Sequence, residues 1–127
     1  MPSRAKDWLA QAERDLDHAR ISADAKQHEW ACFAAHQAAE KALKALHYAR
    51  GEEAWGHVVR QLLDGLGAPE KLIQKGQVLD TYYVPTRYPN GHASGAPFEY
   101  YGVLQSSEAI RYAGEIIEYA RLQMAGA

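Results

Sequence analysis

Alanine and leucine recur through residues 30–50 with the spacing of one helix face, and no Gly or Pro interrupts the segment. Each residue of a helix is rotated by about 100° from the one before it, so the alanines fall on one narrow seam of the helix. Three further residues beside them widen this seam into a face that can pack in the core. This face comprises Ala31, Ala35, Ala38, Ala42, Ala45 and Ala49, with Ala39, Leu43 and Leu46 beside them. The segment therefore predicts one long central helix that another helix can approach closely.

The opposite arc of this central helix is mostly polar. It carries His36, Gln37, Glu40, Lys41, Lys44 and His47. Glu40 precedes Lys44 by one turn, an order that favours an ion pair, so we expect a solvated, salt-bridged face. Trp30, Phe33 and Tyr48 lie in this arc or at its edge. Because a polar surface does not explain three aromatic residues, we expect a second helix or a second subunit to cover part of it.

Helical periodicity extends to the segments on both sides. A first helix, capped by Ser3, is expected to run to about residue 22 and to form an antiparallel hairpin with the central helix. A short helix is expected within residues 57–67, and a further helix from Pro69 to about residues 84–85. The last helix is expected from residue 104 or 105 to residue 124. Its start would be capped by Ser106 or Ser107, and its apolar stripe is Ala109, Ala113, Ile116, Ile117, Ala120 and Met124.

Residues 84–102, between the last two helices, contain three prolines and three glycines and cannot continue a helix. Loops of this length are uncommon in compact domains, and those that occur are functional or disordered. The aromatic residues Tyr88, Phe98, Tyr100 and Tyr101 favour an ordered, functional loop, since disordered linkers are poor in aromatics. We therefore predict an all-α fold, an antiparallel up-and-down bundle of four main helices plus one short helix, as one domain over residues 1–127.

Composition narrows the functional classes. A net charge of −2 with mixed signs provides no global field that would attract nucleic acid, so any RNA contact must be local. No apolar run approaches the roughly 20 residues of a membrane helix. The charged amino terminus lacks an apolar signal region, and the single cysteine, Cys32, excludes an internal disulfide. We therefore expect a cytoplasmic protein.

Arg87 and His92 are the residues of the loop that carry chemistry, separated by YPNG. An arginine supplies a planar, permanently charged fork for phosphate, and a histidine exchanges protons near neutral pH. Together they suffice to cleave RNA without a metal, with His92 taking the proton of a 2′-hydroxyl and Arg87 stabilising the charge on phosphorus. The spacing alone is also compatible with an arginine that pins the loop through carbonyl groups or Asp80.

Four segments resemble one family. They are AERDLDHA in the first helix, FAAHQAAEKALKAL in the central helix, His57 followed by VVRQLL, and LDTYYVPTRYP before the loop. These segments look like the HEPN domain (higher eukaryotes and prokaryotes nucleotide-binding), and the resemblance covers nearly the whole chain. It implies an antiparallel helical bundle, usually a homodimer, often encoded beside a minimal nucleotidyltransferase as a toxin–antitoxin pair.

Many members of that family carry an arginine, four to six residues and then a histidine, and act as metal-independent endoribonucleases. Arg87 and His92 fit this spacing, whereas Ser94 replaces a tyrosine that some members carry. We expect a protein that binds nucleotide or RNA and works with a nucleotidyltransferase-type partner. The binding residues expected are Arg87, Tyr88, His57, Lys41 and Lys44. The alternatives are an active endoribonuclease toxin with Arg87 and His92 as catalytic residues, or a dimeric interaction module without enzyme activity.

Two further residue pairs are weaker candidates for a functional site. Arg50 and His57 form a second arginine–histidine pair, in which His57 is expected to cap the short helix and hydrogen-bond locally. Cys32 and His36 lie one turn apart, but two ligands do not make a zinc site, so we expect a core thiol beside a surface histidine and no metal. The chain has no Walker loop, dinucleotide fingerprint or nucleophile elbow, and we expect no cofactor.

Overall fold

The computed structural model describes residues 3–126, and within this range it is helical without strands. The α-helices are α1 (Ala5–Asp24), α2 (His28–Ala49), α3 (Val59–Gly65), α4 (Glu70–Asp80) and α5 (Val103–Ala125). Two short 3₁₀ turns, η1 (Pro89–Gly91) and η2 (Pro97–Glu99), lie in the loop before α5. The predicted all-α fold is confirmed.

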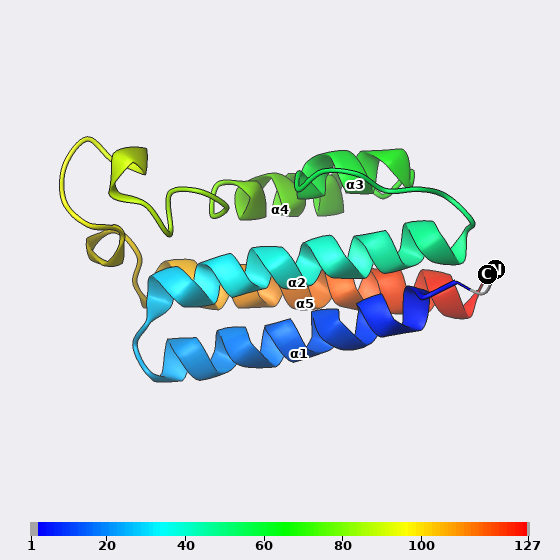
Figure 1. Cartoon of the computed structure of the whole chain (residues 1–127), viewed down its shortest axis with the longest axis horizontal. Coiled ribbons are helices and arrows are strands. Elements are labelled where there is room, and N and C mark those ends of the chain that lie inside the picture. Colours follow the sequence, from blue (N-terminus) through cyan, green and yellow to red (C-terminus); the bar gives the residue numbers. More distant parts are fainter. Residues whose placement is uncertain (1–2, 127) are drawn as a thin grey trace.

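Helices α1, α2 and α5 lie side by side along the long axis, and α3 and α4 form a layer over α2 (Figure 1). The directions of α1, α2, α4 and α5 alternate. The start of α1 and the end of α5 therefore lie at the same end of the bundle (Figure 1). After α2, the chain turns back along the bundle before α3 begins. The loop between α4 and α5 projects beyond the opposite end, where α2 starts.

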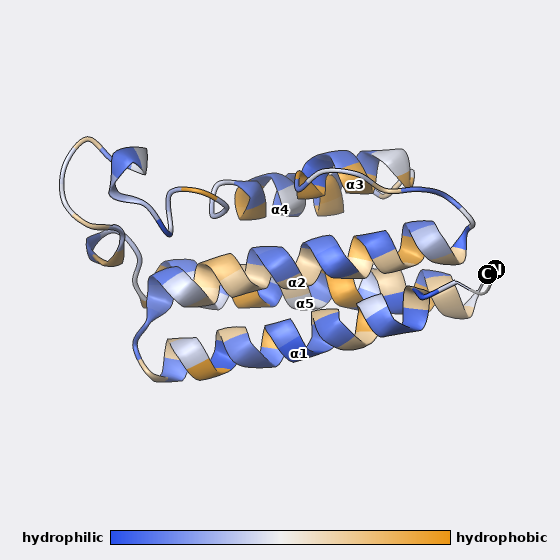
Figure 2. Cartoon of the chain, viewed as in Figure 1, coloured by the Kyte–Doolittle hydropathy of each residue, from blue (hydrophilic) through white to orange (hydrophobic). Residues whose placement is uncertain are grey.

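The core follows the predicted small-residue seam of α2. Six alanines of α2 are fully buried, as are the larger Leu43 and Leu46. From α5, the buried residues are Ala109, Ala113, Ile116, Ile117 and Ala120, together with Ser106. Hydrophobic positions of α3 and α4 face α2, while the outer faces are polar (Figure 2). Small side chains at these contacts allow close packing of the backbones, as the periodicity predicted.

Several helix ends differ from the sequence-based prediction. The last helix begins at Val103, because the side chain of Gln105 accepts a hydrogen bond (2.8 Å) from the backbone of Gly102. Neither predicted serine caps it, and Ser106 is instead buried against His28. Helix α4 ends at Asp80 rather than near Pro85, because the backbone N–H groups of Thr81 and Tyr82 bond to carbonyls three residues back, which closes a tighter final turn.

Within the described residues, no helix combines the length and apolar character that crossing a membrane requires.

Candidate functional site

The polar arc of α2 is largely buried, in contrast to the solvated face that its sequence predicts. His36 is fully buried, and Glu40 and Lys44 are nearly so. The prediction of a surface histidine beside Cys32 is therefore wrong, because segments from the α3–α4 side of the bundle cover this part of α2. Among the described residues, every buried side-chain nitrogen and oxygen has a hydrogen-bond partner. Such complete pairing makes the burial of these polar groups tolerable.

Glu40 lies at the centre of this buried polar group. Its Oε1 is 2.9 Å from Nδ1 of His57, and its Oε2 is 3.2 Å from Nζ of Lys44. The Glu40 side chain is 5% exposed, whereas that of His57 is 55% exposed. A carboxylate only accepts hydrogen bonds, so Nδ1 of His57 carries the hydrogen and Nε2 is left as the basic nitrogen. Nε2 has no hydrogen-bond partner among the described residues.

Asp80, at the end of α4, caps α3. Its carboxylate accepts hydrogen bonds from the backbone N–H groups of Val59 (2.7 Å) and Arg60 (3.0 Å). The prediction that His57 caps this helix is therefore wrong. Nε2 of the buried His36 donates to the backbone carbonyl of His57 (2.9 Å) and lies 3.3 Å from Asp80. Asp80 and His36 together fix the backbone from which the His57 side chain projects.

The ring of Tyr83 brings several predicted residues together. Its centroid is 5.1 Å from that of His57, in a stacked arrangement, and 4.8 Å from Cζ of Arg87. The guanidinium of Arg87 also lies over the rings of Phe33 (4.3 Å) and Tyr88 (5.1 Å). We call these five residues the Tyr83 cluster. Of the predicted binding residues, Arg87 and His57 lie against the Tyr83 ring, and Tyr88 joins the cluster through its contact with Arg87.

Arg87 is held in this cluster through one nitrogen. Its Nε donates to the backbone carbonyl of Tyr83 (2.8 Å), and the residue is half-buried. Its two terminal nitrogens have no hydrogen-bond partner among the described residues. The planar group is therefore oriented by its neighbours while two of its nitrogens stay available to an anion.

His92 has different surroundings from Arg87. Its Nε2 donates to the backbone carbonyl of Pro85 (2.7 Å), and its ring stacks on that of Tyr100 at a centroid distance of 4.0 Å. No hydrogen bond or ring contact joins His92 to Arg87 among the described residues. These two contacts help to order the loop between α4 and α5, which we predicted from the sequence to be ordered.

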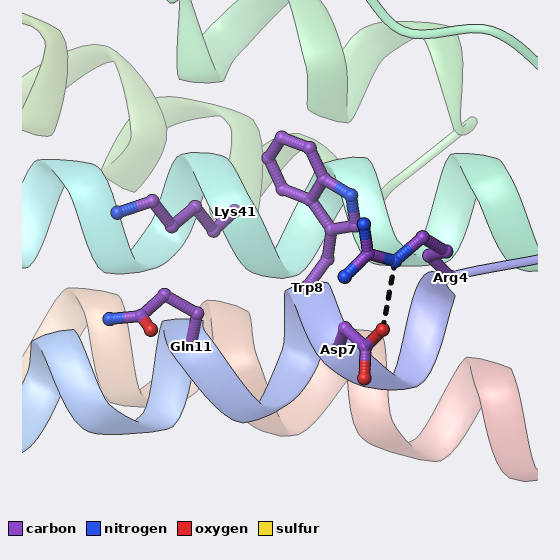
Figure 3. A pocket seen from close by; sticks show the side chains of 5 residues that line it. All are labelled: Arg4, Asp7, Trp8, Gln11 and Lys41. Atoms are coloured by element: carbon purple, nitrogen blue, oxygen red, sulfur yellow. Dashed lines mark hydrogen bonds and ion pairs between the residues drawn. The ribbon is translucent and has the colours of Figure 1, made fainter.

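Lys41 and Lys44, the other predicted binding residues, are both paired. Lys44 pairs with Glu40, and Lys41 pairs with Asp15 of α1. Lys41 also lines a shallow pocket of about 390 Å³ between α1 and α2, shown in Figure 3, with Arg4, Asp7, Trp8 and Gln11. None of the residues lining this pocket belongs to the Tyr83 cluster.

Metal and thiol chemistry find little support in the structure. Among the described residues, no group of three or more His, Cys, Asp or Glu side chains is placed to hold a metal ion. Burial raises the pKa of the Cys32 thiol to about 12, so the thiol is protonated at neutral pH and is a poor nucleophile.

The sequence did not identify Tyr83 as a site residue. It also did not identify His36 and Glu40 as the residues that hold His57 in place. The only signals were the position of His36 one turn before Glu40 and the aromatic pair of Tyr82 and Tyr83 ahead of Arg87. Neither signal reveals which partners these residues meet, because those partners come from other segments of the chain.

Comparison with known proteins identifies the family. The HEPN domain model matches residues 5–123. The chain belongs to the HEPN family. The protein TT1696 of Thermus thermophilus is 44% identical, with a TM-score of 0.92, and the match covers 96% of this chain and 99% of that one. The sequence resemblance to HEPN domains is thereby confirmed.

Two HEPN structures also have the same fold. The archaeal HEPN homologue ST0689 is 39% identical with a TM-score of 0.86, over 97% of this chain and 99% of that one. A HEPN domain protein of Thermotoga maritima is 31% identical with a TM-score of 0.73, over 91% of this chain and 94% of that one. The comparison with curated proteins gives no match.

Proposed function

We propose that this HEPN protein binds a nucleotide or a single-stranded RNA segment at the Tyr83 cluster. The observation that carries the proposal is the guanidinium of Arg87, which lies against three aromatic rings with both terminal nitrogens unpaired among the described residues. An arginine oriented in this way binds phosphate through two parallel hydrogen bonds. Because its orientation is already fixed, less conformational entropy is lost when the anion binds.

Tyr88 supplies the second element of the proposed site. It is 50% exposed and lies beside Arg87, so its ring is accessible to a base. Stacking of a base on an aromatic side chain contributes roughly 1–3 kcal/mol and tolerates any base. A local arginine with an aromatic platform also fits the weakly negative chain, whose net charge of −2 gives no long-range attraction for RNA.

The test is fluorescence anisotropy with a short fluorescein-labelled single-stranded oligoribonucleotide. Arg87→Ala is expected to weaken binding by roughly 10- to 100-fold, since a hydrogen bond to a charged group contributes about 1.5–3 kcal/mol. Arg87→Lys should recover only part of this loss, because an ammonium lacks the planar fork. The control is Arg14→Ala on the exposed face of α1. Equal affinities for the Arg87→Ala variant and the wild type would refute the proposal.

An endoribonuclease with Arg87 and His92 as catalytic residues is the competing function. One observation favours it: both side chains are anchored to carbonyl groups of the same short segment, those of Tyr83 and Pro85. In this mechanism the remaining ring nitrogen of His92 would accept the proton. His92→Ala should then abolish RNA cleavage without changing RNA affinity, and cleavage at the wild-type rate would remove His92 from the mechanism.

The proposal extends to a cytoplasmic homodimer that works with a nucleotidyltransferase-type partner, as the family resemblance implies. The exposed Trp30, in edge contact with Phe33 at 6.2 Å, supports an interface on this side of α2. Light scattering after size-exclusion chromatography should show a dimer for the wild type and a monomer for Trp30→Asp. A dimer that binds no nucleotide in calorimetry would instead favour the interaction module.

A further inference from the structure

We infer that a pocket at the start of α5 binds a small amphipathic anion, a carboxylate attached to an apolar body. This pocket, which we call the α5 pocket, lies between the end of α1, the turn into α2 and the first turns of α5, at one end of the bundle (Figure 1). Its volume is about 680 Å³, against about 390 Å³ for the pocket in Figure 3. None of its lining residues belongs to the Tyr83 cluster, so the inference is independent of the proposed RNA site.

The first observation is the charge of the α5 pocket. Arg20 of α1, Lys26 of the turn and Arg111 of α5 line it, together with the acidic Asp24. Neither Lys26 nor Arg111 has an ion-pair partner among the described residues, and Arg111 lies over the ring of its neighbour Tyr112. Positive charge from three segments thus meets in one pocket of a chain whose net charge is −2. Such a pocket favours an anionic ligand.

The second observation is the backbone at Lys26, which has a φ of 64°. Lys26 follows the end of α1, where its N–H bonds to the carbonyl of Ala23 and that of Gln27 to the carbonyl of Ser22. Glycine is the usual residue in this left-handed position, and a side chain there is strained. Because the ammonium of Lys26 has no partner among the described residues, no contact within this part of the chain offsets the strain. A strained residue is typical of sites that hold a ligand.

The third observation is a polar contact at the wall of the pocket. Oγ of Ser106, a residue only 2% exposed, lies 2.8 Å from Nδ1 of His28. A hydroxyl can donate or accept, so this contact persists whether or not Nδ1 carries a hydrogen. Nε2 of His28 has no hydrogen-bond partner among the described residues. An anion in the pocket selects the form in which Nε2 carries a hydrogen and donates it.

The fourth observation is the apolar surface of the same pocket. Val103, the first residue of α5, is 66% exposed, and Ala23 and Ile110 are half-buried. Small-molecule sites of roughly 300–1,000 Å³ combine such apolar walls with a few polar groups that orient the ligand. A purely polar anion would leave the apolar wall exposed to water. We therefore expect the carboxylate to lie near the basic residues and the apolar body to lie against Val103 and Ile110.

The experiment is an NMR titration of the ¹⁵N-labelled full chain with sodium octanoate, at concentrations below those that form micelles. Saturable shifts are expected for amides within residues 20–28 and 103–111, which contain the α5 pocket. Acetate has the same head group without the apolar body, and 1-octanol has the body without the charge. Each should bind at least about 10-fold more weakly than octanoate, because each lacks one of the two interactions.

Two variants test the basic residues. Arg111→Gln is expected to weaken octanoate binding about 10-fold, since it removes a charged hydrogen-bond donor. The matched control is Arg14→Gln, at an exposed position of α1 outside the pocket, which should keep the wild-type Kd. Lys26→Gly should also weaken binding, yet it should unfold at a higher urea concentration than the wild type, because glycine adopts the φ of Lys26 without strain. A loss of binding in this variant is then not a loss of folding.

Three results would overturn the inference. The first is an octanoate titration whose shifts do not saturate or do not centre on the pocket. The second is equal affinity for octanoate and 1-octanol, which would mean that the basic residues select no anion. The third is a wild-type Kd for both Arg111→Gln and Lys26→Gly. Each of these results leaves the proposed RNA site untouched, because RNA affinity is measured separately and depends on Arg87.

Discussion

Oε1 of Glu40 lies 2.9 Å from Nδ1 of His57, although 17 residues separate the two along the chain. The contact connects the middle of α2 to the segment just before α3. It also places a buried carboxylate between an imidazole and the ammonium of Lys44. A buried charge of this kind is tolerable only while its partners remain in place. The stability of this region and the position of His57 against Tyr83 therefore depend on the same buried carboxylate.

Glu40→Ala is expected to destabilise the protein by about 3 kcal/mol or more, as for other broken buried ion pairs. The substitution leaves Nζ of Lys44, whose side chain is only 10% exposed, without its carboxylate partner. Urea unfolding followed by circular dichroism measures the change in the free energy of unfolding.

Glu118→Ala is the matched control for this substitution. Glu118 also pairs with a basic residue on its own helix, Arg121, but its side chain is 54% exposed. Exposed pairs contribute about 1 kcal/mol or less, so this variant should unfold near the wild-type urea concentration. The double variant Glu40→Ala with Lys44→Met should regain part of the lost stability. If Glu40→Ala and Glu118→Ala had equal effects, Glu40 would not be a buried ion-pair partner.

The helical bundle was predictable because the signal for it is local. A helix that buries one face repeats its apolar residues with the helical period, and the stripe of α5 from Ala109 to Ala120 is buried as predicted. Proline and glycine likewise marked the loop before α5. Helix ends were less certain, because side-chain caps such as Gln105 compete with the serines that the sequence favoured.

The site was only partly predictable, because its contacts join segments distant in the sequence. Arg87 and Tyr88 were found from their residue types, but the contact between Arg87 and Phe33 depends on how the loop packs against α2. The sequence of α2 has charged residues where a solvent-exposed face would have them. Only the packing of the segments after α2 shows that Glu40 is buried.

Asp80→Ala is expected to cost roughly 1–2 kcal/mol, because Asp80 fills the role of a helix cap from a different helix. The substitution leaves the N–H groups of Val59 and Arg60 without their carboxylate. Hydrogen exchange of these two amides, measured by NMR, should accelerate more than that of the α2 backbone. Asp64→Ala, at an exposed position of α3, is the control and should leave their exchange unchanged.

Gly76→Ala and Gly65→Ala should have opposite effects on stability. A Cβ at Gly76 would lie 2.6 Å from Cδ1 of Leu63 and 3.0 Å from Cγ1 of Val59, both of which are fully buried. Overpacking of this kind costs about 1–3 kcal/mol and exceeds the gain in helix propensity, roughly 1 kcal/mol.

At Gly65, the atom nearest to an added Cβ would be Cε1 of the His47 ring at 3.5 Å, an ordinary contact. Gly65→Ala should therefore keep the propensity gain and raise the melting temperature, whereas Gly76→Ala should lower it. Differential scanning calorimetry of both variants compares the same chemical change in two helices. A stabilised Gly76→Ala variant would show that α3 and α4 are packed less closely than described.

Cys32 gives the protein a component of stability that is lost at alkaline pH. Burial raises the pKa of its thiol from 9.0 to about 12 in the folded state. Below pH 9 the thiol is protonated in both states, so this contribution is fully present. Between pH 9 and pH 12 the unfolded chain releases a proton that the folded chain retains, and unfolding becomes more favourable by about 1.4 kcal/mol per pH unit.

Comparison with Cys32→Ala isolates this component, because the variant has no thiol to ionise. The stability difference between the wild type and the variant should fall by about 1.4 kcal/mol from pH 8 to pH 10, measured by urea unfolding under reducing conditions. Burial also raises the pKa of Tyr82, from 10.0 to about 12, so this tyrosine contributes chiefly above the measured range and is present in both proteins. A constant difference across the range would mean that the thiol ionises equally in the folded and unfolded chains, which contradicts its burial.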